Sequence, residues 1–121
     1  MNATETVLLL DDYPDSCEAV ATWLELEGYT TICATTVDDA VAALARDEVH
    51  VVVMEPYLRS GPAMQVAQAA RAKGGRRVLV ISMSASGREG DHTAYEPTLF
   101  DYNFVKPFSL EMLRQALTMA R

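Results

Sequence analysis

The sequence predicts an α/β protein in which a doubly wound, five-stranded parallel sheet is covered by helices on both faces, as a single three-layer domain. Two observations support this fold class. Apolar residues alternate along the chain between the period of a strand and the period of a helix, and several strand segments are apolar on both faces, as central parallel strands must be. A chain of 121 residues, 50% of them hydrophobic, can bury one core. Alternating β and α units join parallel strands through right-handed crossovers.

Five short runs of β-branched or apolar residues predict the strands. The runs are "TVLLL" (Thr6–Leu10), "YTTIC" (Tyr29–Cys33), "VHVVVM" (Val49–Met54), "RVLVIS" (Arg77–Ser82) and "YNFV" (Tyr102–Val105). Most of these runs are too apolar for a sheet that faces water.

Four segments place their apolar residues on one face of a helix. The four stripes are Cys17, Val20, Ala21 and Leu24; Val37, Ala40, Val41 and Leu44; Ala63, Val66, Ala67 and Ala70; and Leu110, Leu113, Leu117 and Ala120. Gly28 is expected to end the first helix, Thr36 to cap the second with Asp39 three residues on, and Ser109 to cap the last.

The segment Ser84–Asp101 is where a further helix, the fourth in chain order, belongs. It contains two glycines and a proline and lacks a clear apolar stripe. The sequence therefore predicts a weak or irregular fourth helix, at most a short one around Tyr95–Phe100.

Charge and composition exclude several classes of protein. The net charge of -7 argues against direct nucleic-acid binding, and the one basic stretch, "RAKGGRR" (Arg71–Arg77), is expected to be a solvated helix end and loop. No apolar run approaches the roughly 20 residues that span a bilayer, and no signal segment opens the chain. We expect a cytoplasmic protein without a membrane partner. Cys17 and Cys33 are expected to be reduced core thiols.

Polar residues stand where the predicted strands end. Asp11 and Asp12 follow the first strand, Glu55 the third, and Ser82 and Lys106 end the fourth and fifth. In a sheet of order 2-1-3-4-5 the first and third strands are neighbours, so the three carboxylates are expected to converge at the carboxyl edge. Such a cluster repels itself unless a cation joins it, and its oxygen ligands suit Mg²⁺. The simpler alternative is that the aspartates are turn and cap residues.

Four motifs in this order resemble the receiver domain of two-component response regulators, over essentially all of residues 1–121. "LLLDDYPDS" is similar to the acidic pair after the first strand, "VVVMEPYL" to the phosphoacceptor motif, "VISMS" to the Ser/Thr switch and "FVKPFS" to the Lys-Pro motif. The resemblance implies the flavodoxin-like strand order 2-1-3-4-5.

The resemblance also implies roles for single residues. Mg²⁺ would be bound by Asp11, Asp12, the acid at position 55 and the backbone carbonyl of Tyr57. The acid at position 55 would accept the phosphoryl group. Ser82 would donate a hydrogen bond to one phosphoryl oxygen, and Lys106 would neutralise another.

The chain departs from the family pattern at several of these positions. The family has aspartate where this chain has Glu55, which is longer by one methylene. Arg59 replaces the usual turn proline, and Asn103 replaces the usual aromatic switch residue. Tyr102 is expected to point to the opposite face of its strand from Asn103.

Two functional classes follow from the resemblance and its departures. The first is an atypical or pseudo-receiver, a regulatory module and not an enzyme, which acts by protein–protein contact with little or no phosphorylation. The alternative is an active phosphoacceptor that takes phosphate, with Mg²⁺, on Glu55 or a neighbouring Asp. Expected partners are a sensor histidine kinase or phosphotransfer protein and a target protein bound on the face of the fourth helix, fifth strand and fifth helix. A haloacid-type hydrolase is a third reading, for which the chain lacks a DxD-like pair and a cap insertion.

Overall fold

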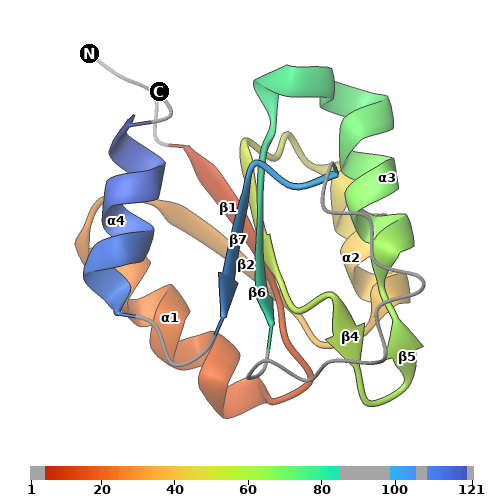
Figure 1. Ribbon diagram of the computed structural model, residues 1–121, viewed down its shortest axis with the longest axis horizontal. Coiled ribbons are helices and arrows are strands. Elements are labelled where there is room, and N and C mark those ends of the chain that lie inside the picture. The colour runs from red at the N-terminus through yellow and green to blue at the C-terminus, as the bar shows by residue number, and fades with distance from the viewer. Residues whose placement is uncertain (1–4, 85–98, 106–108, 120–121) are drawn as a thin grey trace.

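The sheet has five parallel strands in the order β2-β1-β3-β6-β7, which confirms the predicted order 2-1-3-4-5 (Figure 1). The computed structural model of the chain describes residues 5–84, 99–105 and 109–119. The strands of this sheet are β1 (Thr6–Leu10), β2 (Thr30–Ala34), β3 (Val51–Met54), β6 (Leu79–Ser84) and β7 (Tyr102–Val105).

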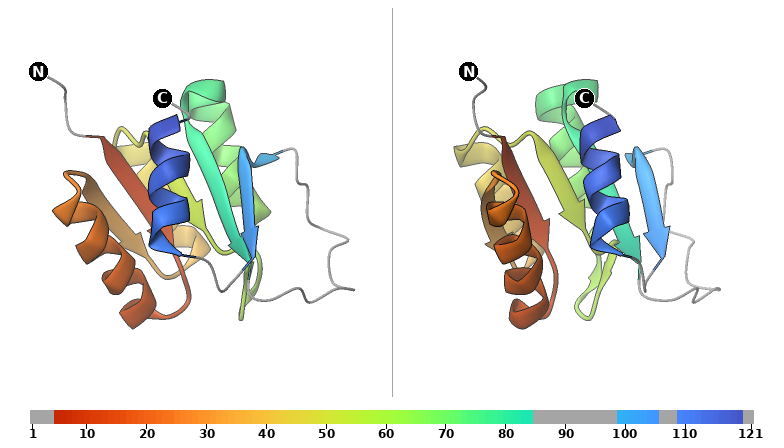
Figure 2. Two further views of the ribbon diagram at one scale, coloured as in Figure 1. Left: turned by 60° about the vertical axis from the view of Figure 1, so that its left-hand side comes forward. Right: turned by 90° about the vertical axis from the view of Figure 1, so that its left-hand side faces the viewer.

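Helices cover both faces of the sheet, as Figure 2 shows. They are α1 (Pro14–Leu26), α2 (Val37–Arg46), α3 (Met64–Gly74), which continues into the short 3-10 helix η1 (Gly75–Arg77), and α4 (Leu110–Met119). Helices α1 and α4 lie on one side, and α2 and α3 on the other. The irregular helix predicted around Tyr95–Phe100 falls largely outside the described residues. No helix in the described ranges is long and apolar enough to cross a bilayer.

The sheet separates two hydrophobic cores, because side chains of a strand alternate between its faces. Leu8, Leu10 and Val52 pack on the α2 and α3 side, whereas Val7, Leu9 and Val53 pack on the α1 and α4 side. All four residues of β3 are 0% exposed. The apolar run "VVVM" is thus explained by a central strand with helices over both of its faces.

The predicted helix boundaries are confirmed by the caps. Gly28 follows α1 with φ +101°, a conformation that side chains rarely adopt. Thr36 Oγ1 accepts the Asp39 N–H at 3.0 Å, and Ser109 Oγ accepts the Met112 N–H at 3.1 Å. Each hydroxyl satisfies a backbone donor that the first helical turn leaves open.

A short antiparallel pair, β4 (Tyr57–Leu58) and β5 (Gly61–Pro62), was not predicted. Its turn residues are Arg59 and Ser60, and Gly61 has φ +131°. The buried Leu58 and the hydrogen bond from the Ala63 N–H to the Pro56 carbonyl, at 2.9 Å, fasten the pair to the domain. The hairpin lies at the end of the sheet toward which the strands point (Figure 1).

Two predictions about side-chain environment were wrong. Cys33 is exposed and is not a core thiol, because β2 is an edge strand; Cys17 is buried as predicted. Arg71 is not a solvated helix-end residue, since its side chain is only 19% exposed and forms an ion pair with Asp101 at 2.9 Å. The basic composition of Arg71–Arg77 predicted solvation and gave no sign of the ion pair between Arg71 and Asp101.

Candidate functional site

The register of the parallel strands places the predicted site residues at one edge of the sheet. Leu10 pairs with Met54, and Met54 pairs in turn with Ser82. Asp11 and Glu55 directly follow the first of these pairs, and the Glu55 N–H donates to the Leu10 carbonyl at 3.0 Å. Asp11, Glu55 and Ser82 are therefore brought together on three adjacent strands, as the sequence predicts.

These three residues are also the buried polar or charged residues of the described part of the chain. Asp11 is 5% exposed, Glu55 8% and Ser82 1%. Burying a carboxylate is unfavourable unless other groups compensate its charge and satisfy its oxygens. Two buried acids and a buried hydroxyl at the same edge therefore indicate a site, and the alternative of simple turn and cap residues explains less of the pattern.

The acidic pair after β1 is held by local contacts. Asp11 Oδ1 accepts the backbone N–H of Tyr13 at 3.0 Å. Asp12 Oδ2 accepts the backbone N–H of Arg59, and the Arg59 Nε lies 3.6 Å from the same oxygen. The Asp12 side chain is 13% exposed, whereas that of Arg59 is 71% exposed. The β4–β5 turn thus places a cation and a donor on one carboxylate of the pair.

The fit of Mg²⁺ to this site is partial. Carboxylate oxygens are the donors that Mg²⁺ prefers, and two of them belong to adjacent residues at the strand end. Within residues 5–84, 99–105 and 109–119, however, no group of three or more His, Cys, Asp or Glu side chains is arranged so that it could hold a metal ion. The expected convergence of Asp11, Asp12 and Glu55 therefore does not amount to a preformed three-carboxylate ligand set.

The remaining predicted residues are placed less completely. Tyr57, the predicted carbonyl ligand, is the first residue of β4, two positions after Glu55. Lys106 and Pro107, from the predicted Lys-Pro motif, lie outside the described residues.

Ser82 donates a hydrogen bond from its hydroxyl to Asn103 Oδ1 at 2.9 Å. The two residues are register partners on β6 and β7. Tyr102 packs toward the α1 and α4 side and stacks on Phe104, with ring centroids 6.0 Å apart. The prediction that Tyr102 points away from Asn103 is confirmed, and the residue beside Ser82 is an amide instead of an aromatic ring.

Replacing Asn103 by Ala is expected to lower the free energy of unfolding by about 1 kcal/mol, because the buried Ser82 hydroxyl loses this acceptor. Urea unfolding followed by circular dichroism measures the change. Ser82→Ala and the double variant complete a cycle in which the two losses should not add. Strict additivity would show that the hydrogen bond contributes nothing to stability.

Cys17, on the first turns of α1, is a buried thiol whose surroundings disfavour its ionisation. Burial, with the neighbouring Cys33 thiol and the Asp11 carboxylate, raises the pKa of the Cys17 thiol far above its usual value. Its Sγ lies 3.6 Å from the Leu9 carbonyl oxygen. A raised pKa lowers the reactivity of a thiol, because the thiolate is the nucleophilic form.

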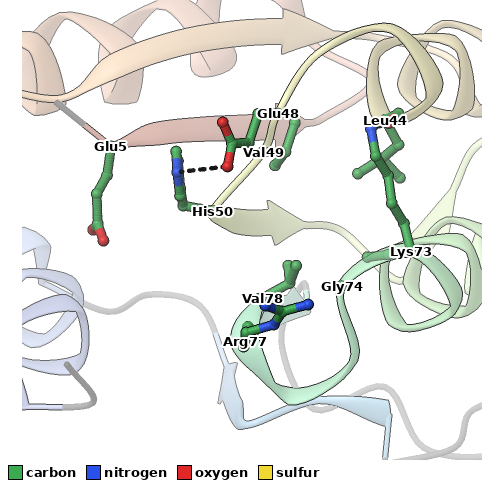
Figure 3. Close-up of a pocket in the computed structure, with 10 residues that line it drawn as sticks. Glu5, Leu44, Glu48, Val49, His50, Lys73, Gly74, Arg77 and Val78 are labelled. Atoms are coloured by element: carbon green, nitrogen blue, oxygen red, sulfur yellow. Dashed lines mark hydrogen bonds and ion pairs between the residues drawn. The ribbon is translucent and has the colours of Figure 1, made fainter. Parts of the chain in front are cut away.

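A cavity of about 720 Å³ lies elsewhere, where β3 and β6 begin, and none of the predicted site residues lines it (Figure 3). His50 Nδ1 accepts the backbone N–H of Thr6 at 2.9 Å, and its Nε2 lies 3.8 Å from Glu48. Lys73 donates to the carbonyl oxygens of Leu44 and Asp47 at the end of α2. These polar groups already serve the connections between elements, so the carboxyl edge is the better candidate for the functional site.

The family model of the response regulator receiver domain matches residues 7–118 of this chain. The chain belongs to this family. Receiver domains are modules of two-component signalling. No curated protein matches the sequence.

Solved receiver structures share the fold at low sequence identity. The response regulator TrrA of Thermotoga maritima, in complex with Mg²⁺ and BeF, is 18% identical with a TM-score of 0.80, over 98% of this chain and 100% of that one. CheY4 of Vibrio cholerae is 17% identical with a TM-score of 0.81, over 98% and 100%. A receiver protein of Pseudomonas putida is 18% identical with a TM-score of 0.82, over 97% and 98%.

Arg59 and Tyr13 are site residues that the sequence did not assign. Arg59 is visible in the sequence as a departure from the family's turn proline, but its contact with Asp12 depends on the β4–β5 hairpin. Tyr13 follows the acidic pair, and the guanidinium carbon of Arg59 lies over its ring, 4.6 Å from the ring centroid. Neither contact has a signal in hydrophobic period or motif spacing.

Proposed function

We propose that this receiver domain is an atypical one that acts as a regulatory module, and not as an enzyme, through protein–protein contact with little or no phosphorylation. The observation that carries the proposal is Glu55, a buried glutamate at the end of the central strand β3. Phosphoryl transfer depends on in-line positioning of the acceptor oxygen. A carboxylate one methylene too long is displaced by on the order of 1 Å, which is enough to slow the transfer strongly.

The second support is the environment of Ser82. Its hydroxyl donates to Asn103 Oδ1 at 2.9 Å, and the same proton cannot at that moment be donated to a phosphoryl oxygen. The ring of Tyr102 packs on the other side of the sheet. A receiver in which Ser82 is hydrogen-bonded to Asn103 is poorly suited to the usual coupling between phosphorylation and an aromatic switch residue.

We propose that the acidic edge retains a weak affinity for Mg²⁺. Asp11, Asp12, Glu55 and the backbone carbonyl of Tyr57 would hold the ion, which when bound supplies positive charge to the carboxylates. Lys106 would contribute the other compensating charge, and Ser82 the hydroxyl donor. Support comes from the oxygen donors at the strand ends and from the Mg²⁺ that TrrA carries in its complex.

The proposed partners are a sensor histidine kinase or phosphotransfer protein and a downstream target, in the cytoplasm. The target would bind the face that includes β7 and α4. Val105, Leu110 and Met112 are large hydrophobic residues of this region that are 52%, 37% and 44% exposed. Such side chains can be covered by a partner.

The test is incubation of the native chain with acetyl phosphate and Mg²⁺, followed by intact mass measurement. We expect little or no phosphoryl adduct over a time in which an ordinary receiver domain, used as the positive control, labels completely. Prompt and stoichiometric labelling of the native chain would overturn the proposal and favour the alternative, an active phosphoacceptor on Glu55 or a neighbouring Asp. Peptide mapping would then identify the modified residue.

A further inference from the structure

We infer that Arg59 is a built-in cation that competes with divalent metal for Asp12, so that metal binding at the acidic edge requires the guanidinium to move away. The inference rests on the proposed function only in taking the acidic edge as the place where a metal would bind. It adds a residue of this chain that regulates the same site.

The first step of the argument is the contact itself. Two groups of Arg59 approach one oxygen, Asp12 Oδ2: its backbone N–H donates to this oxygen, and its Nε lies 3.6 Å away. A metal bound through Oδ2 would have to share or displace these groups. A positive guanidinium at that distance also repels a divalent cation directly.

The second step is that Arg59 is held in place from two sides. Its guanidinium carbon lies 4.6 Å from the centroid of the Tyr13 ring, within the range of a cation–π contact. Its backbone belongs to the β4–β5 turn, where Leu58 is only 6% exposed and pairs with Gly61. The cation is therefore positioned by the fold and not by Asp12 alone.

The third step is the size of the effect. The Arg59 side chain is 71% exposed, so water screens its charge and the competition is modest. Mg²⁺ sheds its water reluctantly and needs near-ideal octahedral geometry, which makes even a weak competitor matter. We expect removal of the guanidinium to raise divalent cation affinity about three- to tenfold.

The experiment titrates Mn²⁺ into the native chain, Arg59→Gln and Arg59→Lys, and follows free Mn²⁺ by electron paramagnetic resonance. Arg59→Gln should bind most tightly, and Arg59→Lys should stay close to the native affinity because it keeps the charge. Tyr13→Leu, which removes the ring under the guanidinium, should fall between the native chain and Arg59→Gln. Asp12→Asn in the Arg59→Gln background should lose the gain.

Arg46→Gln is the matched control for net charge. Arg46 is also an exposed arginine paired with an aspartate, Asp47 at 3.1 Å, but it ends α2, at the opposite edge of the sheet. Its variant should bind Mn²⁺ as the native chain does. Equal affinities of the native chain and Arg59→Gln, or no binding by either at millimolar Mn²⁺, would overturn the inference, as would an equal gain in Arg46→Gln.

This outcome is separable from that of the proposed function. Labelling of the native chain by acetyl phosphate would overturn the phosphorylation-independent role and leave the comparison of Arg59 variants intact. Conversely, an unchanged Mn²⁺ affinity in Arg59→Gln would remove Arg59 as a regulator without showing that the native chain accepts phosphate.

Discussion

Replacing Glu55 by Asp is expected to raise the rate of phosphoryl uptake from acetyl phosphate by on the order of a hundredfold. The shorter side chain withdraws the acceptor oxygen by about 1 Å, and a misplacement of this size costs roughly that factor in rate. Its surroundings are otherwise retained, because Glu55 is 8% exposed and its backbone N–H is fixed to the Leu10 carbonyl at 3.0 Å. The initial rate of adduct formation, measured by intact mass, gives the comparison.

Two controls make the result specific to position 55. Glu55→Gln matches glutamate in size and removes the carboxylate, so it should not label. Peptide mapping of the labelled Glu55→Asp variant should find the phosphoryl group on residue 55 and not on Asp12. An aspartate variant that labels no faster than the native chain would show that the length of the acid is not what limits the reaction.

Replacing Arg71 by Ala is expected to lower the free energy of unfolding by about 3 kcal/mol, the second large effect. The guanidinium, whose side chain is 19% exposed, pairs with Asp101 at 2.9 Å. It also donates to three backbone carbonyls, at 3.2, 3.1 and 2.7 Å, those of Leu99, Gly75 and Val78. One side chain therefore joins the end of α3 to the beginnings of β6 and β7, and its removal leaves several acceptors without their donor.

Urea unfolding followed by Trp23 fluorescence and circular dichroism measures this loss. Arg71→Lys should recover only part of the stability, because one ammonium cannot reproduce the fork of guanidinium donors. Arg46→Ala is the matched control, since the Arg46 side chain is 65% exposed and should change stability by less than about 1 kcal/mol. Equal losses in Arg71→Ala and Arg46→Ala would contradict the structural role of Arg71.

The sheet and most of its helices could be predicted because they depend on local pattern. The run "VVVM" is apolar on both faces because β3 is central, and Thr36 and Ser109 cap their helices through bonds that span three residues. The strand-end positions of Asp11, Glu55 and Ser82 follow from strand order. The segment predicted as an irregular fourth helix, and Lys106, lie outside the described residues.

The features that could not be predicted depend on contacts between distant residues. Arg59 meets Asp12 across 47 positions of sequence, and Arg71 meets Asp101 across 30. Neither contact leaves a hydrophobic period, and a charged residue in a polar stretch is usually solvated. Cys33 was predicted wrongly even though the predicted order 2-1-3-4-5 already puts its strand at the edge of the sheet, where side chains are less completely covered.

The position of β1 between β2 and β3 also bears on the order in which the chain folds. Strand β1 is complete early in the chain, yet its pairing with β3 joins residues as far apart as Val7 and Val51. During synthesis, β1 can pair with β2 first, but its other edge must wait until Met54 has emerged. Long-range parallel pairing of this kind is slow. We therefore expect the half from β1 to β3 to form the first three-stranded unit, onto which β6 and β7 add.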